Sequence, residues 1–245
     1  MKVSRVSSTT TSSTASLWFP DMDNTVIFTC GGRDYPRKGF IFDFDGVVVD
    51  TETYHYRSWL AAAELSACTL DPVEYLPLKS TGNTIIANYI LEHSGKAVTE
   101  EAARTIFTDK ERIFRQIIQD LSEKDILPGI PAFLSFLKAR GVKMAVASSS
   151  HATCELAARF GLDEFFPVII DGKTKLPRKP QPDTFLLAAK LLDVDPSDCI
   201  VFEDSLAGIG AGVNAKMPVV AIGGIQSPDA VLHLQDFSQF DRYFR

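Results

Sequence analysis

One stretch constrains the fold more than any other: residues 39–51, which read Gly-Phe-Ile-Phe-Asp-Phe-Asp-Gly-Val-Val-Val-Asp-Thr. A run of large apolar residues is typical of a strand buried in a parallel sheet. This run ends in two carboxylates, Asp43 and Asp45, although an unpaired buried carboxylate costs several kcal/mol. Ligands bind at the carboxyl ends of strands in open α/β sheets. We therefore predict a site here, with one aspartate for attack or metal binding and the other for proton transfer.

Strand-like and helix-like segments alternate through the second half of the chain. This alternation predicts an α/β fold with a doubly wound parallel sheet, Rossmann-like in its layering. Further strands are expected at residues 142–147, 166–170, 199–202 and 219–222, and helices at 131–140, 152–160, 183–192 and 205–215.

Between the first and second strands, only helical patterns occur. Helices are expected at residues 52–66, 83–93 and 100–121, the last opened by Thr99 as its N-cap. We therefore predict an all-helical cap domain over residues 53–123. Since it leaves the sheet directly after the first strand, it should lie over the carboxyl edge. The core domain would then comprise residues 40–52 and 124–245.

The first 39 residues differ from the rest of the chain. Residues 4–16 are mostly Ser and Thr, and Lys2 and Arg5 are the only charged side chains before Asp21. Such a segment buries too little apolar surface to order itself, so we expect a largely disordered extension. Ser-rich, acid-poor N-termini include organelle transit peptides, as for plastids, whereas a plain extension would leave the protein cytoplasmic. We favour the plain extension.

This extension contains a second Asp-x-Asp, formed by Asp21 and Asp23. Pro20 removes a backbone donor just before the pair, and only three apolar residues precede it. Because no buried strand leads into this pair, we assign it no catalytic role.

Composition narrows the range of partners. The net charge of −6 argues against binding to nucleic acid or to an anionic membrane surface. No apolar run approaches the roughly 20 residues that span a bilayer. The four scattered cysteines read as reduced thiols and not as a disulfide framework or a zinc site; they are Cys30, Cys68, Cys154 and Cys199.

Three more polar clusters adjoin predicted strands or helices. Residues 148–150 are three serines that close the second strand, Glu203 and Asp204 close the strand at 199–202, and Lys179 lies just ahead of a helix. Each cluster alone could be an ordinary turn, helix start or loop. Their joint position at one edge of the sheet favours a chemical role.

The charges at this edge require compensation. Its four carboxylates are Asp43, Asp45, Glu203 and Asp204. Each like-charged pair about 4 Å apart costs roughly 4 kcal/mol at an effective dielectric near 20. Hard oxygen donors with no His or Cys nearby in sequence select Mg²⁺. With Lys179 and the Ser148 hydroxyl, such a site could hold a transferring phosphoryl group.

The motifs Asp43-Phe44-Asp45-Gly46-Val47, Ser148, Lys179 and Glu203-Asp204 match, in order and spacing, the four motifs of the haloacid dehalogenase-like superfamily. The resemblance covers roughly residues 40–225. It is strongest to the branch that contains β-phosphoglucomutase and related sugar-phosphate phosphatases with a helical cap. Residues 50–59 resemble the cap-entry segment of that branch, and residues 202–209 resemble its fourth motif.

The resemblance implies roles by position. Asp43 would be the nucleophile, forming an aspartyl phosphate and binding Mg²⁺. Asp45 would be the general acid and base, with its backbone carbonyl on the metal; a dehalogenase would need no such proton donor. Ser148 and Lys179 would hold the phosphoryl group. The pair at 203–204 would complete the metal site.

The resemblance also implies substrate contacts. They are Thr51, His55, Trp59, Lys79, Asn83 and Lys110 from the cap side and Ser149, Ser150 and His151 from the core. Alternatives stay open for three of them: Trp59 as cap core, His55 as a helix-surface residue and Lys110 as a solvated lysine.

Two departures bear on the reaction. Asn83 stands where the mutase cap has an arginine, and His151-Ala152 replaces a Lys-Asn pair that helps hold a second phosphate. Losing these cations costs several kcal/mol of charge-assisted binding. We therefore place hydrolysis of a small phosphorylated sugar or polyol ahead of hexose phosphomutase activity. An inactive binding protein is the third alternative, and a monomer is expected.

Overall fold

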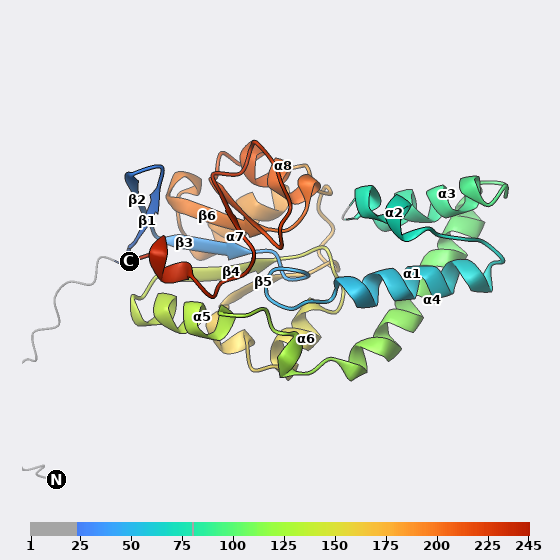
Figure 1. Ribbon diagram of the computed structural model, residues 1–245, viewed down its shortest axis with the longest axis horizontal. Helices are drawn as coiled ribbons and strands as arrows, with labels where there is room; N and C mark the ends of the chain where they lie inside the picture. The colour runs from blue at the N-terminus through green and yellow to red at the C-terminus, as the bar shows by residue number, and fades with distance from the viewer. Residues whose placement is uncertain (1–23, 80) are drawn as a thin grey trace, which may run out of the picture.

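The computed structural model describes residues 24–79 and 81–245. Six parallel strands form one sheet in the order β5-β4-β3-β6-β7-β8, and an antiparallel hairpin, β1–β2, lies beside the start of β3 (Figure 1). The strands are β1 (Val26–Cys30), β2 (Arg33–Arg37), β3 (Gly39–Phe42), β4 (Lys143–Ala147), β5 (Val168–Ile170), β6 (Cys199–Glu203), β7 (Val219–Ile222) and β8 (Leu232–Leu234). The predicted doubly wound parallel sheet is confirmed.

The helices follow the predicted order, with short 3₁₀ turns between them, except that the short helix α2 was not predicted. They are α1 (Glu52–Leu65), α2 (Pro72–Tyr75), α3 (Asn83–His93), α4 (Glu100–Ile117), α5 (Ile130–Ala139), α6 (Thr153–Arg159), α7 (Asp183–Leu192) and α8 (Leu206–Asn214). None of the helices in the part of the chain that the structure describes is long and apolar enough to cross a membrane.

β3 is the central strand, hydrogen-bonded to β4 on one side and β6 on the other. Its side chains alternate between two cores, as expected for a strand buried on both faces. Phe40 and Phe42 face a cluster of aromatic rings that includes Phe133 of α5. Ile41 faces the opposite side, against the cluster that contains Phe185 of α7. The residue that follows β3 therefore emerges in the middle of the carboxyl edge.

Helices α1 to α4 leave the core after β3 and return before β4; we call them the helical insert. They lie beyond the carboxyl ends of the strands (Figure 1). Their own apolar cluster packs α1, α3 and α4 together and includes Trp59, Ala63, Ile90 and Ile106. Because this cluster is separate from the two clusters on the sheet, the insert is stabilised by its own contacts.

The two segments that connect the insert to the core are joined to each other. The Asp50 amide donates to the Asp125 carbonyl at 2.7 Å, and the Leu127 amide donates to the Val48 carbonyl at 3.0 Å. We call residues 48–50 and 125–127 the hinge. The hinge is therefore a short paired ribbon and not two independent linkers.

The β1–β2 hairpin corrects the expectation of disorder for part of residues 1–39. Gly31 and Gly32 form its two-residue turn with φ of +56° and +71°, a geometry that glycine adopts without strain. Phe28 is buried in the aromatic cluster and stacks on Phe244 at 5.2 Å. The Ile27 amide also donates to the Arg245 carbonyl at 2.9 Å, so the chain end holds the hairpin in place. Residues 1–23, with the second Asp-x-Asp, lie outside the described residues.

Candidate active site

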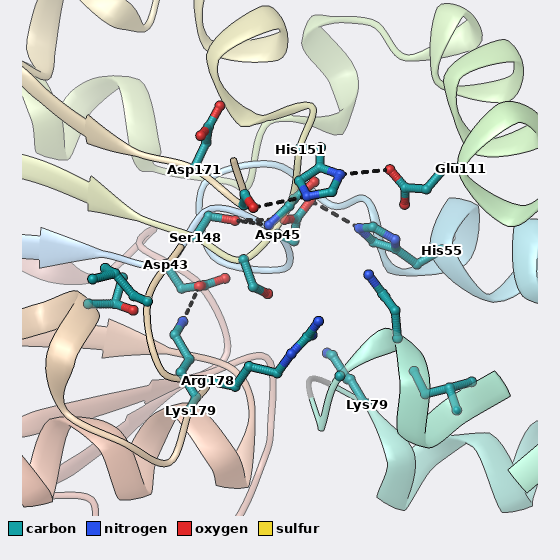
Figure 2. A pocket seen from close by; sticks show the side chains of 18 of the residues that line it. Asp43, Asp45, His55, Lys79, Glu111, Ser148, His151, Asp171, Arg178 and Lys179 are labelled. Carbon is teal, nitrogen blue, oxygen red and sulfur yellow. Dashed lines mark hydrogen bonds and ion pairs between the residues drawn. The ribbon is translucent and has the colours of Figure 1, made fainter. Parts of the chain in front are cut away.

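A cavity of about 550 Å³ lies between the carboxyl ends of the strands and the helical insert (Figure 2). It is lined by the four residues predicted to be catalytic: Asp43, Asp45, Ser148 and Lys179. It is also lined by eight of the nine residues predicted to bind substrate: His55, Trp59, Lys79, Asn83, Lys110, Ser149, Ser150 and His151. Thr51 is the exception, because it is fully buried and lies outside the lining.

Asp43 and Lys179 form the centre of the site. The Lys179 ammonium donates to Oδ1 of Asp43, to Oε1 of Glu203 at 2.6 Å and to the Ala147 carbonyl at 3.3 Å. Burial raises the pKa of Asp43 well above its usual range; Lys179 opposes this shift and Glu203 adds to it. Burial acts to lower the pKa of Lys179, but the two carboxylates outweigh it and raise that pKa. Lys179 is therefore a buried cation shared by two acids.

Glu203 holds this lysine from behind and lies outside the cavity lining. Its Oε2 accepts hydrogen bonds from the Ser205 amide at 2.8 Å and from the Ser205 hydroxyl at 2.9 Å. Gly208, in the first turn of α8, makes room for this carboxylate, because a Cβ there would lie 1.7 Å from Oε1. Glu203 was predicted to complete the metal site, but both of its oxygens are engaged here, one by Lys179 and one by Ser205, so we assign it to positioning Lys179.

Asp45 is surrounded by donors. Thr51 donates to its Oδ1 at 2.6 Å, the His55 Nε2 lies 3.3 Å from the same oxygen, and Ser148 donates to Oδ2 at 3.1 Å. Burial acts to raise the pKa of Asp45, but its partners, His55 above all, outweigh burial and lower the pKa to about 2. Asp45 is therefore a carboxylate in this arrangement, and Thr51 acts on Asp45 and not on a ligand.

Asp204 contacts the insert through Lys79. The Lys79 ammonium lies 2.5 Å from Oδ2 of Asp204 and 3.2 Å from Oε2 of Glu52. Burial and the Glu203 charge raise the pKa of Asp204 to about 7, although Lys79 opposes them. Asp204 also lies against the loop after β3, because a Cβ on Gly46 would come within 2.0 Å of its Oδ2. The fourth predicted motif therefore meets the first.

The residues present fit a hard divalent cation. Asp43 and Asp204 offer carboxylate oxygens, and the glycine at position 46 leaves the loop and Asp204 in close approach. Oxygen donors of this kind suit Mg²⁺. Among the described residues, no three His, Cys, Asp or Glu side chains already form a metal centre. Ammonium groups contact the carboxylates instead, Lys179 on Asp43 and Lys79 on Asp204.

The insert contributes a buried cation of its own. Lys110 of α4 is 2% exposed, and its ammonium lies 4.5 Å from the Phe114 ring centroid and 2.9 Å from Oε1 of Glu111. The same Phe114 ring stacks on His55 at 4.1 Å. Lys110 is therefore not a solvated surface lysine, and the aromatic ring between it and His55 fixes both side chains at the cavity wall.

His151 joins the core to the insert. Its Nδ1 lies 3.2 Å from Oε2 of Glu111 on α4, and its Nε2 lies 2.9 Å from the Gly172 carbonyl (Figure 2). One side chain therefore contacts both α4 of the insert and the loop after β5 of the core. Glu111 was missed from the sequence, although it directly follows Lys110.

Sequence reasoning also missed several residues that line the cavity. They are Glu52, Tyr75, Phe107, Asp171, Lys175, Arg178 and Thr184. Two of them could have been found because they are next to predicted site residues in the sequence: Arg178 directly precedes Lys179, and Glu52 directly follows Thr51.

Comparisons with known proteins agree with this geometry. The sequence model of the haloacid dehalogenase-like hydrolase family matches residues 37–216. The β-phosphoglucomutase of Bacillus subtilis is 36% identical over 188 residues, which cover 76% of this chain and 83% of that protein. The fructose-1-phosphate phosphatase of Escherichia coli is 30% identical over 184 residues, which cover 75% of this chain and 95% of that protein.

A solved structure shares the architecture as well. The β-phosphoglucomutase from Clostridium difficile superposes with a TM-score of 0.77 at 32% sequence identity. The match covers 83% of this chain and 92% of that one. Sugar-phosphate phosphatases and β-phosphoglucomutases are thus both among the proteins that this chain resembles.

Proposed function

This chain is a member of the haloacid dehalogenase-like hydrolase family, and from that membership we propose that it is a Mg²⁺-dependent phosphatase of a small phosphorylated sugar or polyol. It is an enzyme of the β-phosphoglucomutase and sugar-phosphatase type. One observation supports the proposal most: Asp43, at the end of the central strand, contacts a buried lysine at the floor of a cavity that the insert covers.

In the first half of the reaction, an Asp43 oxygen attacks the phosphorus of the substrate. The ester bond between phosphorus and the sugar oxygen breaks, and the leaving oxygen takes a proton from Asp45. In the second half, water attacks the phosphorus of the aspartyl phosphate and Asp45 accepts its proton. The bond between phosphorus and the Asp43 oxygen then breaks, which releases inorganic phosphate and regenerates the free carboxylate.

Asp45 must change protonation state during this cycle. Its pKa of about 2 makes it a carboxylate in the free site, the form that accepts a proton from water. Negative charge on a bound phosphate raises the pKa of a neighbouring carboxyl group, which favours the protonated form needed in the first half. Thr51 and His55, which both contact Oδ1, hold the group in position throughout.

Mg²⁺ would be held by the carboxylates of Asp43 and Asp204 and by the backbone carbonyl of Asp45. Bound there, it supplies positive charge to the oxygens of the transferring phosphoryl group. For Asp204 to bind a cation, Lys79 must give up its 2.5 Å contact with that carboxylate. Lys179 and Ser148 would hold the remaining phosphoryl oxygens.

The alternative is a hexose phosphomutase, favoured by the 36% identity to a β-phosphoglucomutase. Against it, Asn83 and His151 line the cavity where that branch uses cations for a second phosphate. Incubation with β-glucose 1-phosphate and a trace of glucose 1,6-bisphosphate separates the two. Release of inorganic phosphate supports the phosphatase, whereas glucose 6-phosphate without free phosphate supports the mutase.

A screen of sugar and polyol phosphates tests the proposal directly. We expect phosphate release that requires Mg²⁺, stops with EDTA and disappears in Asp43→Asn. A well-folded protein that releases phosphate from no ester in the presence of Mg²⁺, and isomerises none, would overturn it.

A further inference from the structure

The cavity contains cations that no carboxylate neutralises. Its lining cations are Lys79, Lys110, Lys175, Arg178 and Lys179. Three of them form ion pairs: Lys79 with Asp204, Lys110 with Glu111, and Lys179 with Asp43. Within residues 24–79 and 81–245, neither Lys175 nor Arg178 has a carboxylate within ion-pair distance. Both come from the loop between β5 and α7.

Arg178 reaches across the cavity mouth to the insert. A Cβ on Gly82 would lie 2.8 Å from its Nη1 and 3.3 Å from its Cζ, so the guanidinium packs on the backbone just before α3. Its neighbour Lys179 contacts Asp43 instead. The adjacent residues Arg178 and Lys179 therefore make different contacts: Lys179 with the reacting carboxylate and Arg178 with the insert (Figure 2).

Gly82 is what permits this contact. Its φ is +123°, a conformation that other residues rarely adopt, and any side chain there would collide with the guanidinium. The Lys79 ammonium enters the same cavity from the insert and is already engaged by two acids. Arg178 thus presents an uncompensated positive charge to whatever fills the insert side of the cavity.

Resting on the proposed function, we infer that Arg178 binds a second anionic group, on the part of the substrate that leaves. A guanidinium presents a planar fork of donors that matches a carboxylate or a phosphate bidentately. The favoured substrates are accordingly sugar phosphates that carry a carboxylate or another phosphate away from the reacting one. Neutral polyol phosphates would leave this cation unpaired.

Binding to the Asp43→Asn protein tests the inference without turnover. Calorimetric titrations would compare three probes with Mg²⁺ present: glucitol 6-phosphate, 6-phosphogluconate and fructose 1,6-bisphosphate. We expect the two doubly anionic probes to bind more tightly than the neutral-tailed one. Adding Arg178→Ala should weaken their binding by about 10- to 100-fold and change glucitol 6-phosphate binding by about twofold or less. Arg178→Lys should restore part of the loss.

Lys173→Ala is the charge-matched control. Lys173 lies in the same loop, outside the cavity lining and 3.5 Å from Asp171, so its removal should not alter the order of the three probes. Tighter binding of 6-phosphogluconate would assign a carboxylate tail, and tighter binding of the bisphosphate a phosphate tail. Equal weakening of all three probes by Arg178→Ala, or no preference before the substitution, would overturn the inference.

The proposed function fails in a different way. If these probes bind with the expected preference but the unsubstituted protein releases no phosphate from any ester of the wider screen, hydrolysis is wrong while the role of Arg178 stands. If phosphate is released from all three probes at equal kcat/KM and Arg178→Ala lowers all equally, hydrolysis stands and the role of Arg178 is wrong.

Discussion

The Thr51 hydroxyl donates a 2.6 Å hydrogen bond to Oδ1 of Asp45, six residues earlier in the chain. Thr51 is the N-cap of α1, yet its side chain caps no helix amide. A hydroxyl that would normally stabilise a helix end is directed instead to the proposed acid and base. His55, one turn further along α1, contacts the same oxygen. The first helix of the insert therefore sets the environment of Asp45.

Thr51→Val should lower kcat. The substitution keeps the shape of the side chain but removes a hydrogen bond to a charged group, which is worth about 1.5 kcal/mol, or roughly tenfold in rate. KM should change little because Thr51 lies outside the cavity lining. Steady-state phosphate release measures both constants. Thr51→Ser retains the hydroxyl and should stay near the wild-type rate; an equal loss in both variants would contradict the role assigned to the hydroxyl.

Asp43→Asn should reduce turnover by about a thousandfold or more, because an amide cannot form the aspartyl phosphate. Phosphate release from the preferred sugar phosphate gives the rate, and circular dichroism shows that the fold is retained. Asp21→Asn, in the other Asp-x-Asp, serves as the control and should leave turnover unchanged. A collapse in that variant would show that the wrong pair has been chosen.

Gly208→Ala should destabilise the protein by about 1–3 kcal/mol through overpacking. A Cβ at that position would lie 1.7 Å from Oε1 of Glu203. That oxygen already pairs with the buried Lys179, so it cannot easily move aside. Gly210 lies in the same helix, and the nearest atom to a Cβ there is 3.2 Å away on Pro180. Gly210→Ala should stay within about 1 kcal/mol of wild type. Urea unfolding compares the two; equal effects would show that the Glu203 contact is not the cause.

Glu111→Gln should change how stability depends on pH. Burial acts to raise the pKa of Glu111, but Lys110 and His151 outweigh it and hold the pKa below its ordinary value of 4.5. A lowered folded-state pKa contributes stability above 4.5 that is lost as the pH falls through the folded value. The variant lacks this contribution of about 1 kcal/mol or less, so the difference in unfolding free energy between wild type and variant should shrink on acidification.

Denaturant unfolding at about pH 7 and about pH 3.5 measures that difference. Glu164→Gln is the control, since it removes a pair with Lys138 that lies 3.0 Å apart on the exposed surface. A difference for Glu111→Gln that stays constant over this pH range would contradict the prediction.

The sequence was most informative where chemistry follows a strand. Asp43, Ser148 and Asp204 each come directly after a strand of the same parallel sheet, so the order of residues alone predicts that they meet at one edge. The contacts of Glu203 were harder to predict, because its hydrogen bonds with Ser205 and Lys179 depend on how α8 begins. Local spacing predicts which edge of the sheet a residue reaches, but it does not predict which side chains the residue contacts there.

Other features depended on contacts between distant segments. Arg178 and Gly82 are adjacent only because the insert lies over the core, which no local pattern encodes. The β1–β2 hairpin had a local signal in Gly31-Gly32 between two short runs with strand character. The expectation of disorder rested on the Ser- and Thr-rich composition before this run and did not use that signal. The partner that stabilises the hairpin, Arg245, is at the other end of the chain.

The paired backbone of the hinge limits how the helical insert moves. Two unpaired linkers would let the insert rotate in any direction. Backbone hydrogen bonds join Asp50 to Asp125 and Leu127 to Val48, so the paired linkers favour rotation about a single axis. Rotation about that axis would separate Lys79 from Asp204 and Gly82 from Arg178 at the same time. Exchanging the insert at the hinge would therefore replace Lys79 and Gly82 together, while Asp204 and Arg178 stay in the core.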